Sequence, residues 1–195
     1  MSRLAGAVDA PVASAVLGDA FADSPWTRWT VDADDHVARI TALQRLVIEQ
    51  VAIPFGEVWV AEDEQARIAS VAIWMLPAPP VPPAVWESIA TAQSELEGSR
   101  HSASVAAEAA VLPLRPVVPH YYLGAVGTRS DCQGRGFATA VLAPVLERAT
   151  VEGAIVFLET SKLRNVAFYE RRGFVVTGEL DVPGGGPHVW GMTRR

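Results

Sequence analysis

The hexapeptide Gln133-Gly134-Arg135-Gly136-Phe137-Ala138 joins a strand predicted over residues 121–128 to a helix predicted over residues 137–152. Glycine has no β-carbon, so the backbone N–H groups of this turn can point towards a ligand without steric hindrance. The start of the following helix adds roughly half a positive charge, and such a helix start binds anions such as pyrophosphate. The hexapeptide therefore predicts a phosphate-binding turn, with an ordinary tight turn as the alternative interpretation.

Two common nucleotide-binding motifs do not fit this turn. The chain contains no G-x-x-x-x-G-K-[ST] sequence, and the turn lacks the third glycine of the dinucleotide-binding fingerprint. A second group of signals follows in the chain: a strand predicted over residues 155–159, then Asn165, the aromatic pair Phe168-Tyr169 and Gly173-Phe174. An interpretation of the turn must therefore also account for this second group.

Together the two segments resemble the GNAT acetyltransferase superfamily. Its signature Gln/Arg-x-x-Gly-x-Gly/Ala corresponds to Gln133, Gly136 and Ala138, and its second motif corresponds to residues 157–174. Within the superfamily, the puromycin N-acetyltransferases are similar over nearly the whole chain, including a proline at the position of Pro144. The similar segments outside the two motifs are residues 20–23, 58–61, 71–74 and 190–194.

Predicted strands and helices are mixed along the chain without strict alternation. Strands are predicted over residues 3–5, 58–61, 68–76, 121–128, 155–159, 175–179 and 188–192, and helices over residues 9–22, 35–51, 85–96, 102–112, 137–152 and 165–172. The pattern and the resemblance favour an α/β (α+β) fold: a mixed, mostly antiparallel central sheet of about six to seven strands, flanked by helices on both faces. We expect a single N-acetyltransferase domain over residues 1–195.

Composition excludes several classes of protein. Hydrophobic residues make up 50% of the 195 residues and charged residues 19%, which is typical of a globular chain. The net charge of -6 argues against nucleic-acid or membrane partners, so any anion site must be local. A single cysteine and the absence of a signal-peptide pattern predict a cytoplasmic location. The four histidines show no metal-ligand spacing, and we expect a monomer or a homodimer.

The resemblance implies that acetyl-CoA is the co-substrate. The pantetheine arm is expected along the strand before the turn, with Val126 as the main contact, and the pyrophosphate on the N–H groups of residues 134–139. An ordinary core strand also explains Val126, because backbone contacts leave its side chain free to pack. The residues implied to bind the coenzyme are Val126, Thr128, Gln133, Gly134, Arg135, Gly136, Phe137, Ala138, Thr139, Asn165 and Phe168.

The resemblance also implies that Tyr169 places its hydroxyl near the coenzyme sulfur. A phenol with a pKa near 10 stays protonated at neutral pH and can protonate the departing thiolate; a tyrosine that merely packs is the alternative. Many relatives use a glutamate of the preceding strand as general base, but residues 120–126 contain no carboxylate. Glu159, on the next strand, is the leading candidate to hold a water or to orient the amine, ahead of His120 and Asp23.

Acceptor recognition is expected from the early helices, where Asp23, Trp26 and Trp29 offer a charge and flat apolar surfaces, and from Tyr122. Core packing between the first two helices explains both tryptophans equally well. Ser24 stands where the puromycin enzymes have tyrosine, which puts puromycin itself in doubt. The sequence thus predicts an N-acetyltransferase for a small-molecule primary amine, of which a puromycin-like antibiotic is one example. A protein or peptide amine, or a non-catalytic acetyl-CoA-binding regulatory module, are the alternatives.

Overall fold

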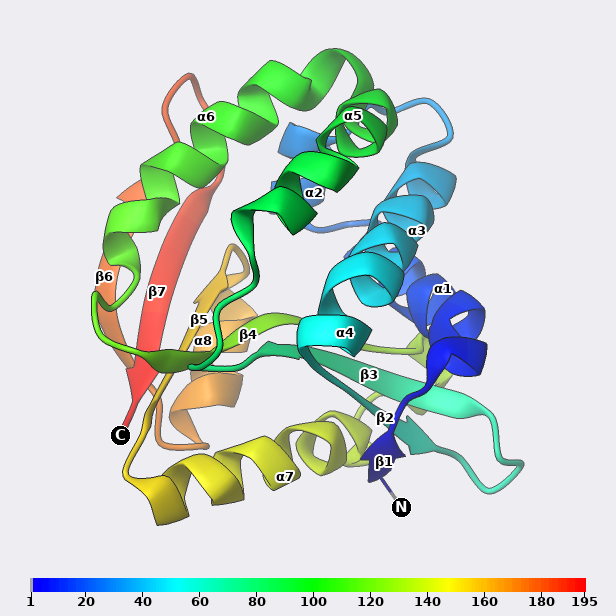
Figure 1. Cartoon of the computed structure of the whole chain (residues 1–195), viewed down its shortest axis with the longest axis vertical. Coiled ribbons are helices and arrows are strands. Elements are labelled where there is room, and N and C mark those ends of the chain that lie inside the picture. The colour runs from blue at the N-terminus through cyan, green and yellow to red at the C-terminus, as the bar shows by residue number, and fades with distance from the viewer. Residues whose placement is uncertain (1) are drawn as a thin grey trace.

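The computed structural model describes residues 2–195, whose seven strands form one sheet in the order β1-β2-β3-β4-β5-β7-β6 (Figure 1). The strands are β1 (Ser2–Leu4), β2 (Gly56–Glu62), β3 (Ile68–Met75), β4 (His120–Thr128), β5 (Ile155–Thr160), β6 (Val175–Asp181) and β7 (His188–Arg194). Every neighbouring pair is antiparallel except β4 and β5, which are parallel. The predicted mixed, mostly antiparallel sheet is confirmed.

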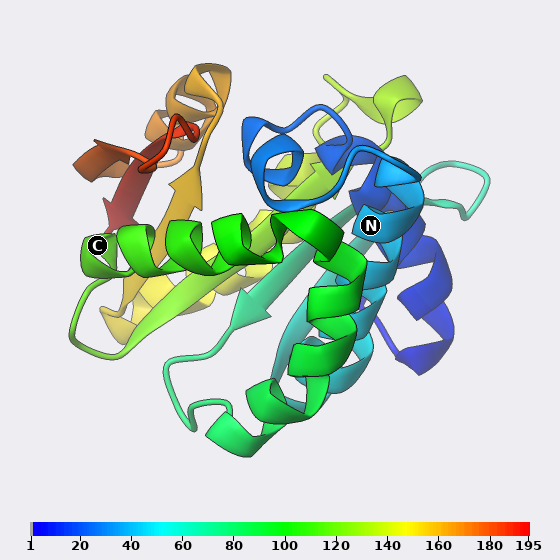
Figure 2. The same cartoon turned by 90° about the horizontal axis from the view of Figure 1, so that it is seen from above.

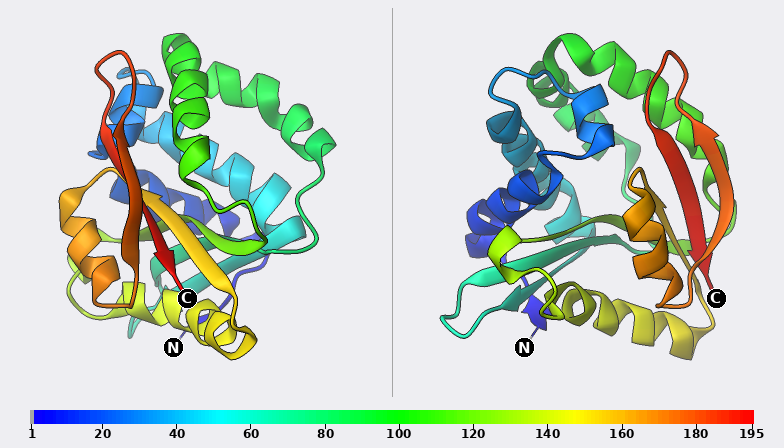
Figure 3. Two further views of the ribbon diagram at one scale, coloured as in Figure 1. Left: turned by 90° about the vertical axis from the view of Figure 1, so that its left-hand side faces the viewer. Right: turned by 180° about the vertical axis from the view of Figure 1, so that it is seen from behind.

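Helices cover both faces of the sheet, as predicted (Figures 1 and 3). The helices are α1 (Ala10–Phe21), α2 (Pro25–Thr30), α3 (His36–Val47), α4 (Ile53–Phe55), α5 (Pro83–Glu97), α6 (His101–Val111), α7 (Phe137–Glu152) and α8 (Leu163–Glu170). Helices α7 and α8 lie against one face, and α1 with α3 covers the other. None of the helices formed by residues 2–195 is long and apolar enough to cross a bilayer.

Two helical predictions need correction, and one helix was missed. The helix predicted over residues 35–51 is observed as α3 followed by a π-helical turn at Ile48–Ala52, and α4 continues it beyond the predicted end. The helix predicted to begin at Asn165 begins at Leu163 instead, because Lys162 still has extended backbone and ends the preceding loop. Helix α2 was not anticipated, because a six-residue helix opened by a proline is too short to show a helical period.

Strand β3 separates two hydrophobic cores. Side chains alternate between the faces of a strand, so Ala72 and Trp74 pack beneath α7, whereas Val71 and Ile73 pack beneath α1. Because both faces are covered, nearly every residue of β3 is buried. This explains why the strand reads as a continuous apolar run in the sequence.

The sheet opens between β4 and β5. Their parallel pairing runs from His120 opposite Ile155 to Leu123 opposite Leu158 and then stops, although β4 continues to Thr128. On the other side of β4, the register against β3 skips Gly124, which forms a β-bulge. A bulge bends a strand and increases its local twist, so β4 turns away from β5 beyond this residue.

Helix α1 approaches the backbone of β4 closely at Gly127. A β-carbon there would lie 2.8 Å from Cβ of Ala20 and 2.9 Å from Cδ2 of Leu17. We therefore expect Gly127→Val to lower the free energy of unfolding by about 1–3 kcal/mol, because overpacking displaces α1. Urea unfolding measures this change, with Gly6→Val as the control, since a β-carbon on Gly6 meets nothing within 4 Å. An equal loss in both variants would contradict the prediction.

Helix α6 joins the N-terminal helices to the far edge of the sheet (Figure 2). Its buried residues Ala107 and Val111 pack against Val182 and Val189 at the β6–β7 end. This third cluster closes one end of the opening between β4 and β5, and it brings a helix from the middle of the chain to that opening.

Candidate active site

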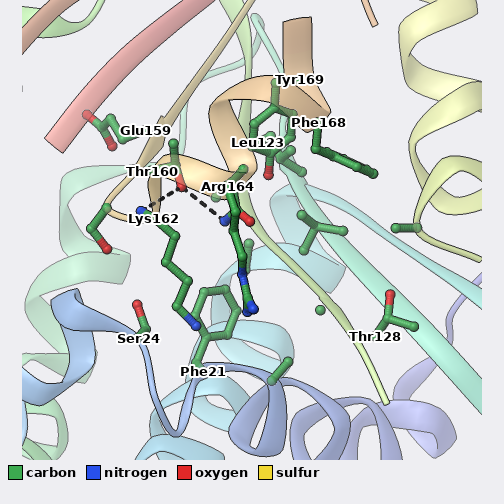
Figure 4. A pocket seen from close by; sticks show the side chains of 18 of the residues that line it. Phe21, Ser24, Leu123, Thr128, Glu159, Thr160, Lys162, Arg164, Phe168 and Tyr169 are labelled. Carbon is green, nitrogen blue, oxygen red and sulfur yellow. Dashed lines mark hydrogen bonds between the residues drawn. The ribbon is translucent and has the colours of Figure 1, made fainter. Parts of the chain in front are cut away.

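A cavity of about 670 Å³ occupies the opening between β4 and β5 (Figure 4). Strand β4 contributes residues 122–128 to its lining, β5 contributes Glu159 and Thr160, and the loop into α7 forms one end. Residues of α1, α2, α6 and α8 complete the wall. The cavity therefore runs continuously from the glycine-rich turn, through the gap in the sheet, to the hydrophobic cluster under α6.

The glycine-rich turn has the backbone that its sequence predicts. Gly134 and Gly136 have φ of +74° and +87°, in the left-handed region that favours glycine. A β-carbon on either residue would meet nothing within 4 Å, and both residues line the cavity. The first N–H groups of α7 have no partner within the helix. Five other predicted coenzyme-binding residues of this region also line the cavity, namely Gln133, Phe137, Ala138, Thr139 and Thr128.

The positive charge facing this turn comes from a different arginine than expected. Arg135 lies outside the lining: its guanidinium is 3.8 Å from Glu64 and stacks over the ring of Phe137. Arg172 lines the cavity instead, with its guanidinium 3.5 Å from the ring centroid of Phe168. No carboxylate among residues 2–195 pairs with Arg172, and burial lowers the pKa of its guanidinium. The sequence offered one signal for Arg172: it follows Phe168 by four residues, just after the end of the same helix.

The start of α8 places further polar groups on the cavity. The side-chain amide of Asn165 donates a hydrogen bond of 3.1 Å to Thr160 Oγ1, which also accepts one from the backbone N–H of Lys162 (Figure 4). The Lys162 side chain extends towards Phe21 and Ser24, and burial lowers the pKa of its ammonium. Lys162 is the only lysine of the chain, and sequence reasoning assigned it no role.

Tyr169 lies beside Phe168 and Leu123 at the gap in the sheet (Figure 4). Its ring packs edge-on against Phe168 and Phe174, with centroid distances of 5.1 and 5.7 Å, and only 5% of the residue is exposed. Burial raises the pKa of its phenol above the ordinary value. Within residues 2–195 no group forms a hydrogen bond with the hydroxyl, and Tyr169 belongs to the lining of the cavity. The phenol therefore stays protonated at neutral pH.

Glu159 lines the other end of the cavity, and its carboxylate is already paired. Arg115 Nε donates to it at 3.0 Å, and the Tyr122 hydroxyl donates at 2.8 Å. Burial and the negative charge of Glu159 raise the pKa of Tyr122 well above its ordinary value. Glu108 lies 3.3 Å from the same arginine and also lines the cavity. Arg115 and Glu108 were not anticipated, because no motif in the sequence marks either residue.

The expected acceptor residues near the N-terminus separate in the structure. Trp26 lines the cavity, whereas Trp29 packs on the β6–β7 turn and beneath Arg100, whose guanidinium lies 4.4 Å from the ring centroid. The two indoles pack against the cluster under α6 rather than between the first two helices. Asp23 forms an ion pair with Arg28, and 83% of its side chain is exposed outside the cavity. Of Asp23, Trp26 and Trp29, only Trp26 therefore lines the cavity.

The chain is similar in sequence and fold to known acetyltransferases. Residues 19–174 match the model of the acetyltransferase (GNAT) family. A crystal structure from Corynebacterium glutamicum, named histone acetyltransferase HPA2 and related acetyltransferase, is 28% identical. The two structures align over 100% of this chain and 94% of the Corynebacterium chain, with a TM-score of 0.77.

Two eukaryotic structures share the fold at lower identity. A mosquito protein named arylalkylamine N-acetyltransferase like 5b is 16% identical, with a TM-score of 0.64 over 100% of this chain and 98% of its own. A polyamine N-acetyltransferase of Drosophila melanogaster is 18% identical, with a TM-score of 0.59 over 99% of this chain and 97% of its own. These likenesses concern the whole length of the chain and include the sheet that carries the cavity.

Proposed function

This chain belongs to the acetyltransferase (GNAT) family and is an acetyl-CoA-dependent N-acetyltransferase, and we propose that its acceptor is the primary amine of a small molecule. One observation carries the proposal. A single cavity joins the phosphate-binding turn to Tyr169 and to an end that is lined by Trp26, Glu108 and Glu159. Such a cavity accommodates a coenzyme arm from one side and a cationic, partly apolar acceptor from the other.

In the proposed reaction, the N–H groups at the start of α7 bind the pyrophosphate, and the positive charge of Arg172 adds to them. The edge of β4 beyond Gly124 has no strand partner on the β5 side, which leaves backbone groups available to pantetheine amides. Thr160 holds the side chain of Asn165 towards the same channel. These contacts position the thioester at the gap, and the amine nitrogen attacks its carbonyl carbon directly.

Tyr169 is the proposed general acid. When the tetrahedral intermediate collapses, the C–S bond breaks and the phenol protonates the thiolate. Two features support this role: the hydroxyl faces the cavity without another partner, and burial keeps the phenol protonated. Glu159 is proposed to orient the acceptor rather than to remove its proton, because Arg115 and Tyr122 already occupy its oxygens.

A small acceptor is favoured over a protein amine by the cluster under α6. A polypeptide acceptor needs an open groove, whereas Trp26 and the β6–β7 end pack together across this end of the cavity. The finer hypothesis of a puromycin-like aminonucleoside fits the aromatic wall formed by Trp26 and Tyr122. The names of the compared proteins refer to different acceptors: a histone, an arylalkylamine and a polyamine.

We expect acetyl-CoA turnover with small aromatic amines. The purified chain is incubated with acetyl-CoA and, separately, with phenethylamine, puromycin, agmatine and a lysine-containing peptide, and free thiol is followed with a thiol-reactive dye. Turnover should be fastest with the small aromatic amines, because Trp26 and Tyr122 line the acceptor end. Turnover with the peptide alone would contradict the small-molecule proposal, and tight acetyl-CoA binding without turnover would contradict catalysis.

A further inference from the structure

At the acceptor end of the cavity, two carboxylates share a single cationic partner among residues 2–195. Arg115 is shared between two carboxylates, 3.0 Å from Glu159 and 3.3 Å from Glu108. Two carboxylates and one guanidinium leave a net charge of about −1 at this end of the cavity, which favours a cationic ligand over a neutral or anionic one. A ligand cation would complete this arrangement, so the cluster itself points to the charge of its ligand.

The two carboxylates are not equivalent. Both oxygens of Glu159 accept hydrogen bonds, from Arg115 and from Tyr122, and its side chain is only 13% exposed. Glu108 has the guanidinium of Arg115 as its one partner among residues 2–195, and 53% of its side chain is exposed. Because Glu108 belongs to the lining, part of this exposed surface faces the cavity. Glu108 is therefore the carboxylate with oxygen positions left for a ligand.

The surroundings of Glu108 also make it a better proton acceptor than an ordinary carboxylate. Partial removal of water raises the pKa of its carboxyl, and the charges of Glu159 and Glu97 act in the same direction. Arg115 opposes them without cancelling them. Glu97 itself is saturated by Gln93, His101 and Ser104, so it does not compete for the ligand.

From this juxtaposition we propose that Glu108 binds the ammonium of the acceptor and accepts its proton, while Glu159 and Arg115 act as positioning residues. The inference rests on the proposed function. One N–H bond of the ammonium breaks, and its proton goes to Glu108 and then to solvent. The neutral amine forms the C–N bond to give the tetrahedral intermediate, and the C–S bond breaks when this intermediate collapses. The second proton lost by nitrogen replaces the one that Tyr169 gives to sulfur.

The proposed site also restricts the acceptor. One uncompensated charge suits one ammonium, and the neighbouring walls are Trp26, Tyr122 and Val189. The favoured acceptor is therefore a primary amine with one cationic group next to an aromatic or other flat apolar group. An acceptor with several cationic groups would leave its additional charge against apolar side chains. We expect phenethylamine to have a higher kcat/KM than agmatine.

Glu108→Gln tests the proposal, with Glu87→Gln as the matched control, because Glu87 is an exposed residue of α5 away from the cavity. We expect Glu108→Gln to lower kcat/KM for phenethylamine by roughly 10²-fold at neutral pH. In the wild type, activity should fall as the pH decreases through a pKa above that of an ordinary carboxyl, and this acid limb should disappear in the variant. Glu108→Asp should restore part of the rate, and acetyl-CoA affinity should not change.

A binding measurement separates the subsite from catalysis. Calorimetry with phenethylamine, in the presence of coenzyme A, should show roughly 10-fold weaker binding to Glu108→Gln, because a charge-assisted hydrogen bond is lost. The neutral analogue phenylethanol should bind both proteins equally. An unchanged rate, pH profile and amine affinity in Glu108→Gln would overturn the inference. If the wild type acetylates no amine, the proposed function fails, and the calorimetry still decides whether Glu108 binds an ammonium.

Discussion

Tyr169→Phe is expected to lower kcat by roughly 10²–10⁴-fold, the usual contribution of a positioned general acid. The substitution removes only the hydroxyl, which has no hydrogen-bond partner within residues 2–195, and it keeps the ring that packs against Phe168 and Phe174. Burial raises the pKa of the phenol, so the acid is fully protonated at neutral pH and its loss affects the whole neutral range. The change in kcat is measured from the initial rate of thiol release at saturating acetyl-CoA and saturating amine.

The control for this prediction is Tyr121→Phe. Tyr121 is also a buried tyrosine, but its hydroxyl donates a 2.6 Å hydrogen bond to Glu152, away from the cavity. Its loss should cost about 1 kcal/mol of stability and leave kcat unchanged. Acetyl-CoA affinity, measured by calorimetry, should be the same in both variants. A Tyr169→Phe enzyme with the wild-type rate would show that another group, or water, protonates the thiolate.

Gly136→Ala is expected to weaken acetyl-CoA binding by roughly 10–100-fold. A methyl group at this residue of the cavity lining meets no protein atom within 4 Å, and we expect it to compete with the pyrophosphate for the helix N-terminus. The loss of one charge-assisted hydrogen bond to a backbone N–H accounts for a change of this size. The measurement is calorimetric titration with acetyl-CoA, followed by KM for acetyl-CoA at saturating amine.

Gly153→Ala is the matched control at the opposite end of α7. Gly153 also has a positive φ, +64° against +87° for Gly136, and a β-carbon there likewise meets nothing within 4 Å. Both variants should lose about 1 kcal/mol of stability, because an L-residue is strained in the left-handed region. Only Gly136→Ala should lose acetyl-CoA affinity. Equal affinities would mean that the pyrophosphate does not bind at this turn.

Features with short-range causes were predicted well from the sequence. The turn at Gly134 and Gly136, the helix that follows it, and the succession of β5, Asn165 and Tyr169 are all encoded within about forty consecutive residues. Strands β2 and β3 were also predicted, because alternation and burial have local signatures. The sequence likewise predicted the helices over residues 85–96 and 102–112, but it did not show which parts of the fold they pack against.

Residues brought together by packing were predicted poorly. Arg135 was expected to face the phosphates because it lies inside the motif, yet Arg172 faces the cavity, since the C-terminal end of α8 lies next to Thr139 at the start of α7. Trp29 and Asp23 were grouped with Trp26 because they are neighbours in the chain. Helix α2, which is short, directs these three side chains to different surroundings.

By itself, the sequence determined the family, the seven strands, most of the helices and the glycine-rich turn, because each depends on the conformational preferences of neighbouring residues. Only the tertiary structure decided the acceptor end of the cavity. Glu108 and Glu159 share Arg115 because α6 packs on the β6–β7 end and because β4 bends away from β5 at Gly124. The contact between these three residues depends on the burial of apolar surface between distant segments. It therefore cannot be predicted from a periodicity or a motif within one segment.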